Sequence, residues 1–217
     1  LAATYAYEIL PLLKKNGTYR LSIRNLDFEQ SLFTIDGVLL DTGYENQTAP
    51  ATSYWISEGC DVILSVPEKG LFPDECKTGY ALAGKVNIST VHSAELYLFS
   101  TGLDHNNRTE HTVKFNKRTW PNIFENATAS GTILLPVTEY VNETGNAVTI
   151  ESSIRSQGAD YLVNRNTILV VEHNDTDSSA PHTPASKYIR PAVPPGAPDS
   201  SLEMNESPCC HITLDSD

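Results

Sequence analysis

Short runs in which apolar and polar residues alternate recur along most of the chain. Tyr19–Arg24 places Tyr19, Leu21 and Ile23 on one face. A period of two residues predicts β-strands that turn one face toward a core. Other short, β-rich runs predict further strands at Val38–Tyr44, Asp61–Val66, Ala94–Phe99, Thr112–Asn116, Thr132–Val137, Ala147–Ile154, Tyr161–Val163 and Thr167–Glu172.

Glycine and proline residues separate these runs, and helical periodicity is weak. Only Tyr7–Lys14 and Val137–Val141 could form a turn or two of helix, and each lies beside a proline. Many short strands separated by turn residues are typical of antiparallel, immunoglobulin-like β-sandwiches. The predicted fold class is therefore all-β.

Several of these segments recur in the same order about 125 residues later, which indicates an internal repeat. The matched pairs are Ile9-Leu10-Pro11 with Leu134-Leu135-Pro136, Leu21-Ser22-Ile23 with Val148-Thr149-Ile150, and Phe33-Thr34-Ile35-Asp36 with Tyr161-Leu162-Val163-Asn164. The repeat predicts two tandem domains, a partial β-sandwich at residues 1–50 and a fuller one at residues 53–176. We expect a neighbouring subunit to cover the open edges of the partial sandwich, because uncovered edges pair promiscuously. The alternative is that residues 1–50 fold back on their own chain.

Composition changes in the last part of the chain, residues 177–217. Six prolines lie between residues 177 and 199. Such a stretch cannot build a strand ladder and predicts an extended, Pro-rich C-terminal tail. The tail ends near Cys209-Cys210, so it is suited to reaching another molecule.

The charge balance limits the partners of the chain. Its net charge is −12, which argues against binding to nucleic acid or to anionic lipid, because both require clustered Lys and Arg. No apolar run approaches 18 residues, so we expect no membrane span. The chain begins at Leu1 without a leader, and export would imply that a leader has been removed.

Asn-x-Ser/Thr sequons provide the main sign of export. About 2.8 would arise by chance from the Asn, Ser and Thr content, whereas the chain contains eight. The alternative is that Asn-rich turns beside Thr-rich strands generate sequons without use. The expected glycosylation sites are Asn16, Asn46, Asn87, Asn107, Asn126, Asn142, Asn174 and Asn205.

Four cysteines are expected to form disulfides in an exported chain. They are Cys60, Cys76, Cys209 and Cys210. Adjacent cysteines rarely bond to each other, so either Cys60 and Cys76 form a local bridge or the tail cysteines join the body of this or another subunit. Metal binding by Cys209, Cys210 and His211 is a third alternative, although the chain lacks a Cys-x-x-Cys pair.

No residue pattern typical of catalysis or of cofactor binding is present. His173 and Asp175 at a strand exit could contribute to a metal site, but a solvated turn explains them better. A separated carboxylate pair for glycoside hydrolysis has little support in a chain rich in acidic residues. We therefore predict no catalytic residues, no metal ligands and no cofactor.

The run Tyr54-Trp55-Ile56-Ser57-Glu58-Gly59-Cys60-Asp61, with Pro67–Gly70 and Ile168–Glu172, resembles an uncharacterised β-sandwich family of exported proteins from methanogenic and other archaea. The resemblance covers about residues 10–174. It implies tandem domains, a cell-surface location and no known enzymatic activity. It also implies small apolar residues at the positions of Cys60 and Cys76, so these cysteines would be additions that favour a cross-linking role.

These observations predict a non-enzymatic structural subunit of an extracellular archaeal sheath or S-layer. Such a subunit would form a homo-polymer through strand pairing between subunits and through disulfides, and would carry N-linked glycans. The step from family to sheath is an analogy. The alternative is a secreted adhesin or carbohydrate-binding module, with Trp55 or Trp120 as its aromatic platform; a hydrolase is a weaker third possibility.

Overall fold

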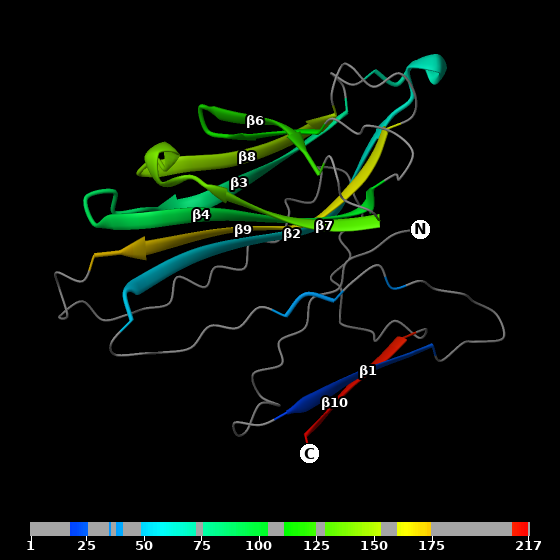
Figure 1. The fold of residues 1–217 in the computed structure, drawn as a ribbon, viewed down its shortest axis with the longest axis horizontal. Coiled ribbons are helices and arrows are strands. Elements are labelled where there is room, and N and C mark those ends of the chain that lie inside the picture. Colours follow the sequence, from blue (N-terminus) through cyan, green and yellow to red (C-terminus); the bar gives the residue numbers. More distant parts are fainter. Residues whose placement is uncertain are drawn as a thin grey trace, which may run out of the picture. The chain divides into compact units, whose positions relative to one another are not determined.

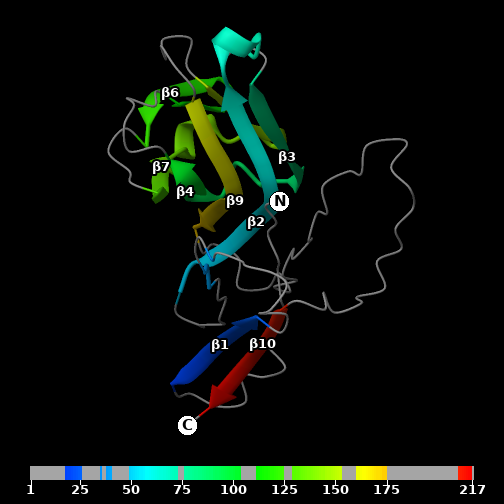
Figure 2. The same ribbon diagram turned by 90° about the vertical axis from the view of Figure 1, so that its right-hand side faces the viewer.

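The structure is a computed structural model of the 217-residue chain, and its strands form two separate units (Figures 1 and 2). One unit is a two-layered β-sandwich, and the other is a pair of strands from the two ends of the chain. The described residues are 18–25, 35, 38–40, 49–72, 76–103, 111–124, 129–152, 160–174 and 210–216. The described part is all-β with antiparallel pairing throughout, which confirms the predicted class.

The first sheet of the sandwich has four antiparallel strands. In spatial order they are β2 (Ala51–Ser65), β9 (Asp160–His173), β4 (Val91–Leu103) and β7 (Ala129–Pro136). The first and last strands of the sandwich in sequence are therefore neighbours, and Ala51 lies opposite His173. This pairing places both ends of the sandwich segment at the same end of the sandwich.

The second sheet also has four antiparallel strands and packs against the first. In spatial order they are β3 (Lys77–Lys85), β8 (Thr144–Ser152), β5 (His111–Phe115) and β6 (Arg118–Ile123). Two short 3₁₀ turns complete the sandwich. They are η2 (Pro67–Lys69), after β2, and η3 (Thr138–Tyr140), before β8.

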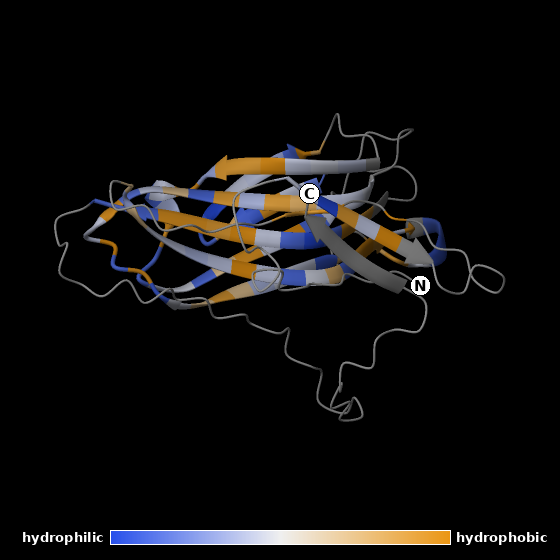
Figure 3. Cartoon of the chain, turned by 90° about the horizontal axis from the view of Figure 1, so that it is seen from below, coloured by the Kyte–Doolittle hydropathy of each residue, from blue (hydrophilic) through white to orange (hydrophobic). Residues whose placement is uncertain are grey.

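Alternation along the strands builds the core between the two sheets (Figure 3). In β4, Ala94, Leu96 and Leu98 are buried, while the residues between them are only partly buried. In β8, Val148 and Ile150 face the same core and are inaccessible to solvent. Burying one face of each strand is the main stabilising contribution of such a sandwich.

Two register shifts interrupt the first sheet at the same level. One lies between Glu58 and Asp61 in β2, and the other between Phe99 and Ser100 in β4, both opposite β9. An extra residue in one strand bends it and redirects the following side chains. As a result, polar side chains of β2, β4 and β9 enter the sandwich interior at this level.

The second unit consists of β1 (Tyr19–Asn25) and β10 (Cys210–Ser216), which are paired antiparallel. We refer to these two strands as the terminal strand pair. The sequence prediction of a strand at Tyr19–Arg24 is confirmed, and its partner in the single chain is the C-terminal strand of that chain. The strand at β10 was missed, because it lies within the range interpreted as an extended tail.

The strands predicted inside the sandwich all overlap observed ones, and two predictions differ most from the structure. Tyr161–Val163 and Thr167–Glu172 are parts of one continuous strand, β9. The strand predicted at Asp61–Val66 begins ten residues earlier, at Ala51. A turn of helix at Val137–Val141 is confirmed as η3.

Of the other predictions for the N-terminal segment, one was wrong and the rest fall on residues that the structure does not describe. Val38–Leu40, the start of a predicted strand, is irregular and exposed. The remainder of that strand and the turn at Tyr7–Lys14 lie outside the described residues. Most of residues 1–50 and of residues 177–217 also lie outside them, so the division into those domains stays a prediction.

Candidate functional sites

Three sequon asparagines gather at one end of the sandwich, on segments that join or follow strands. Asn87 lies between β3 and β4, Asn142 between η3 and β8, and Asn174 directly after β9. All three are exposed. The segments touch one another, because the backbone N–H of Val86 donates to the carbonyl of Glu143 at 2.8 Å and that of Asn174 donates to the carbonyl of Thr90 at 2.7 Å.

A buried asparagine holds the segment that carries Asn142. Asn146, only 2% exposed, accepts a hydrogen bond from the backbone N–H of Asn142 at 2.8 Å and donates one to its carbonyl at 2.8 Å. Asn116 donates to Asn146 and to the carbonyl of Tyr140 from the turn between β5 and β6. Asn116 adopts φ 50, a left-handed conformation that asparagine tolerates well. The fold thus fixes the backbone of Asn142 and leaves its side chain in solvent.

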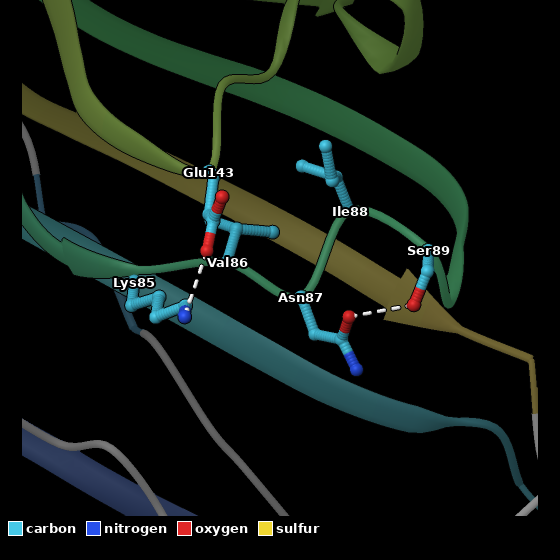
Figure 4. Close-up of a pocket in the computed structure, with 6 residues that line it drawn as sticks. All are labelled: Lys85, Val86, Asn87, Ile88, Ser89 and Glu143. Carbon is cyan, nitrogen blue, oxygen red and sulfur yellow. Dashed lines mark hydrogen bonds and ion pairs between the residues drawn. The ribbon is translucent and has the colours of Figure 1, made fainter.

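The turn that carries Asn87 forms one wall of an open pocket of about 480 Å³ (Figure 4). The Ser89 hydroxyl donates to Asn87 Oδ1 at 2.8 Å, so the acceptor asparagine and the hydroxyl residue of the sequon face each other. Lys85 and Glu143 form an ion pair at 2.7 Å on another side of the pocket. Both are well exposed, so the pair contributes little to stability. The pocket is open, is lined by polar and apolar side chains alike, and includes sequon residues in its wall.

The other five predicted glycosylation sites lie outside the described residues: Asn16, Asn46, Asn107, Asn126 and Asn205.

We expect native protein to carry glycans on Asn87, Asn142 and Asn174, because all three are exposed at turns where a glycan faces solvent. The intact mass should exceed the 23.8 kDa of the polypeptide by several sugar units. Asn142→Gln should lower the native mass by one glycan. Asn122→Asp, at an exposed asparagine outside any sequon, should leave it unchanged. A native mass equal to that of the polypeptide would contradict the prediction.

The cysteines are placed differently from one another. No disulfide joins Cys60 to Cys76. The Cys60 sulfur accepts a hydrogen bond from Arg165 Nη1 at 3.0 Å, and the Cys76 thiol donates to the carbonyl of Leu64 at 2.8 Å. Cys210 is the first residue of β10 and lies opposite Asn25, while Cys209 lies outside the described residues. The structure therefore lacks the local bridge between Cys60 and Cys76, one of the two arrangements considered.

His173 joins three segments at the sequon end, which is the end of the sandwich that carries Asn87, Asn142 and Asn174. Its Nε2 lies 3.1 Å from the Ser53 hydroxyl and its Nδ1 lies 2.8 Å from the Thr90 hydroxyl. Burial lowers the pKa of the imidazole below its usual value, so the ring is neutral at pH 7. Both ring nitrogens are engaged by hydroxyls rather than presented to a ligand. Asp175, its proposed companion in a metal site, lies outside the described residues.

Both tryptophans contribute to packing. Trp55 is 7% exposed, and its indole N–H donates to the carbonyl of Ala83 at 3.1 Å. Trp120 is half-buried, packs edge-on against Tyr140, and has the Arg118 guanidinium 5.6 Å from its ring centroid. A sugar-binding platform needs an open aromatic face, which the buried Trp55 does not provide; at Trp120, the Arg118 guanidinium lies over one face of the ring.

Sequence reasoning missed a buried polar network at the two register shifts. Asp61 accepts hydrogen bonds from the hydroxyls of Tyr80 at 2.6 Å and Thr78 at 2.9 Å. Asn164 donates to the Tyr80 hydroxyl at 2.9 Å and accepts from Ser100 at 3.1 Å. Burial, and then the bond to Asp61, raise the pKa of Tyr80 above its usual value. The sequence feature that could have revealed this network is the run of polar residues from Asn164 to Thr167, which lies between two apolar runs.

Metal-ligating side chains do not form groups of three or more within the described ranges. No helix in the described part of the chain has the length and apolar character needed to cross a bilayer. Two features of the described residues are candidates for a functional site: the sequon end and the terminal strand pair.

The fold and these sites define an all-β sandwich protein with exposed Asn-x-Ser/Thr acceptors at one end. The chain belongs to the family described as "Protein of unknown function (DUF3344)", whose model matches residues 1–172. A comparison with curated proteins found no match.

Two solved structures are similar to part of the chain. The crystal structure of FLHE has a TM-score of 0.33 and 10% sequence identity, covering 57% of this chain and 98% of FLHE. The infectious bursal disease virus VP2 subviral particle has a TM-score of 0.34 and 12% identity, covering 66% of this chain and 37% of the VP2 chain.

Proposed function

We propose that the protein is a glycosylated structural subunit of an extracellular archaeal sheath or S-layer. One observation carries the proposal: the three described sequon asparagines are all exposed and lie on adjoining segments at one end of the sandwich. Clustered glycans would cover this end with hydrated sugar. Subunits would then contact one another through other parts of the chain.

The terminal strand pair supports the assembly part of the proposal. Among the described residues, the two strands pair only with each other in a sheet ladder, and a sheet edge without a ladder partner is a template for pairing with another chain. Cys210 at the start of β10 would place a thiol beside that contact. Cross-links from Cys209 or Cys210 to another subunit would make the assembly resistant to dissociation.

Electron microscopy and non-reducing gels of native material test this function. We expect extended sheets or tubes by microscopy, and multimers on the gel that collapse to single chains with a reductant. A variant with Cys209→Ser and Cys210→Ser should give single chains without reductant. Native protein that appears as isolated particles, and as single chains under both gel conditions, would refute the proposal.

A further inference from the structure

The terminal strand pair has a complete and regular register. Seven residues of β1 pair with seven of β10 without a shift. Leu21 is placed opposite Leu214, Ile23 opposite Ile212, and Arg20 opposite Asp215. The register therefore places apolar residues opposite apolar residues and a basic residue opposite an acidic one, which are favourable cross-strand combinations.

This pair is built from the most distant parts of the sequence. Residues 26–50 separate β1 from the sandwich, and residues 174–209 separate β10 from it. The pair belongs to a different compact unit from the sandwich. A two-stranded sheet is marginally stable in water on its own, so a small free-energy difference decides which copies of β1 and β10 pair.

We infer that β10 exchanges between copies of this chain, so that the β10 strand of one subunit pairs with the β1 strand of the next. The exchanged pair has the same register and the same contacts as the closed one. Exchange of an identical element is a low-cost route to association for this reason. This inference rests on the proposed function and identifies the strands that join its subunits.

Chain length permits the exchange. Residues 174–209, if extended, could span on the order of 100 Å. A sandwich of this size has a diameter of only about 40 Å. The segment is therefore long enough for β10 to reach the β1 strand of a neighbour.

The order of the two strands gives the contact a direction. Each chain has one β1 near its beginning and one β10 near its end. Each subunit would thus receive a strand at one site and donate a strand to another. Reciprocal exchange between two subunits closes a dimer, whereas exchange onward to a third subunit is a head-to-tail contact that continues into rings or open filaments.

Concentration decides between the closed and exchanged forms. Within one chain, the covalent connection holds the two strands at an effective concentration in the millimolar range. Subunits packed side by side on a surface reach a concentration on the order of 10 mM. Exchange should therefore be rare in dilute solution and frequent in a packed layer.

Cross-linking between two single-cysteine variants of the full chain tests the inference. The background replaces the four native cysteines with serine: Cys60→Ser, Cys76→Ser, Cys209→Ser and Cys210→Ser. Leu21→Cys protein and Leu214→Cys protein are mixed and oxidised. Directly opposite residues have Cα atoms about 4.5–5.5 Å apart, within reach of a disulfide. We expect a cross-linked dimer at about 1 mM, and at least tenfold less at about 1 μM.

Two controls complete the test. In a second mixture, Thr213→Cys replaces Leu214→Cys. Adjacent positions of a strand face opposite sides of the sheet, so the second mixture should form at least tenfold less dimer than the first. A chain with both Leu21→Cys and Leu214→Cys should close within itself at about 1 μM, which checks the register. The inference is overturned if the first mixture forms no more dimer than the second, or if the doubly substituted chain fails to close.

The outcomes separate this inference from the proposed function. If native material forms sheets or tubes but the mixture gives no dimer, the inference fails and the proposed function stands. If the mixture gives dimer but native material consists of isolated particles, the strands exchange and the proposed function fails.

Discussion

Trp55→Ala is expected to destabilise the sandwich by about 3–5 kcal/mol, the usual cost of truncating a buried tryptophan. The indole packs in the core with 7% exposure and donates to the carbonyl of Ala83. It also lies against Gly84, where an added Cβ would approach Nε1 to 2.9 Å. Truncation removes this contact, the hydrogen bond and the core packing together. Urea unfolding followed by circular dichroism measures the loss.

Two further variants isolate the cause. Trp55→Phe keeps most of the packing but removes the N–H donor, so it should cost about 1–3 kcal/mol. Leu134→Ala, at a leucine that is 49% exposed on β7, should cost less than about 1 kcal/mol. Equal losses for Trp55→Ala and Leu134→Ala would show that Trp55 is not part of the core.

Asn164→Ala is expected to cost about 2–4 kcal/mol, because it leaves buried polar groups without partners. Asn164 is inaccessible to solvent. Its amide accepts from Ser100 and donates to the hydroxyls of Tyr80 and Thr167. Removing the amide takes away the acceptor of Ser100 and one partner of Tyr80. The free energy of unfolding, again from urea denaturation, measures the effect.

A double-mutant cycle tests whether the network acts as a unit. Tyr80→Phe removes the hydroxyl that links Asn164 to Asp61 and should cost about 1–3 kcal/mol. Combined with Asn164→Ala, it should cost at least about 0.5 kcal/mol less than the sum, because both changes break one hydrogen bond. Strict additivity would contradict the hydrogen bond of 2.9 Å. Thr132→Ala, an exposed change on β7, should cost within about 0.5 kcal/mol.

Alternation identified the central strands but not the edges of the second sheet. β5 and β8 lie in its interior and alternate clearly. β3 contains two glycines and β6 contains Pro121, and both were missed. They are the edge strands of the sheet, where one side of the backbone needs no partner and such residues are tolerated. Sequence signals of strands are weakest at such positions.

Long-range contacts limited the prediction of the sites. Exposure of Asn87, Asn142 and Asn174 follows from their turn sequences. Their position at one end of the sandwich depends on the order of the strands in its two sheets, which cannot be predicted from a local sequence pattern. The polar residues 164–166 separated two predicted strands, Tyr161–Val163 and Thr167–Glu172, because polar residues in succession rarely lie in a core. Asn164 bonds to Tyr80 and Ser100, which come from two other strands, and these contacts accommodate the polar run within β9.

The neighbouring positions of Ala51 and His173 have a mechanical consequence. The chain enters and leaves the sandwich at two residues that face each other across one ladder. Tension along residues 26–50 and 174–209 would therefore pull on adjacent points and open the β2–β9 ladder one residue pair at a time. Separating two antiparallel strands one residue pair at a time requires less force than sliding the strands past each other along their length, because sliding breaks all hydrogen bonds of the ladder together. Within a stretched filament, the sandwich would hang beside the line of force, and β2 and β9 would be the first strands to separate.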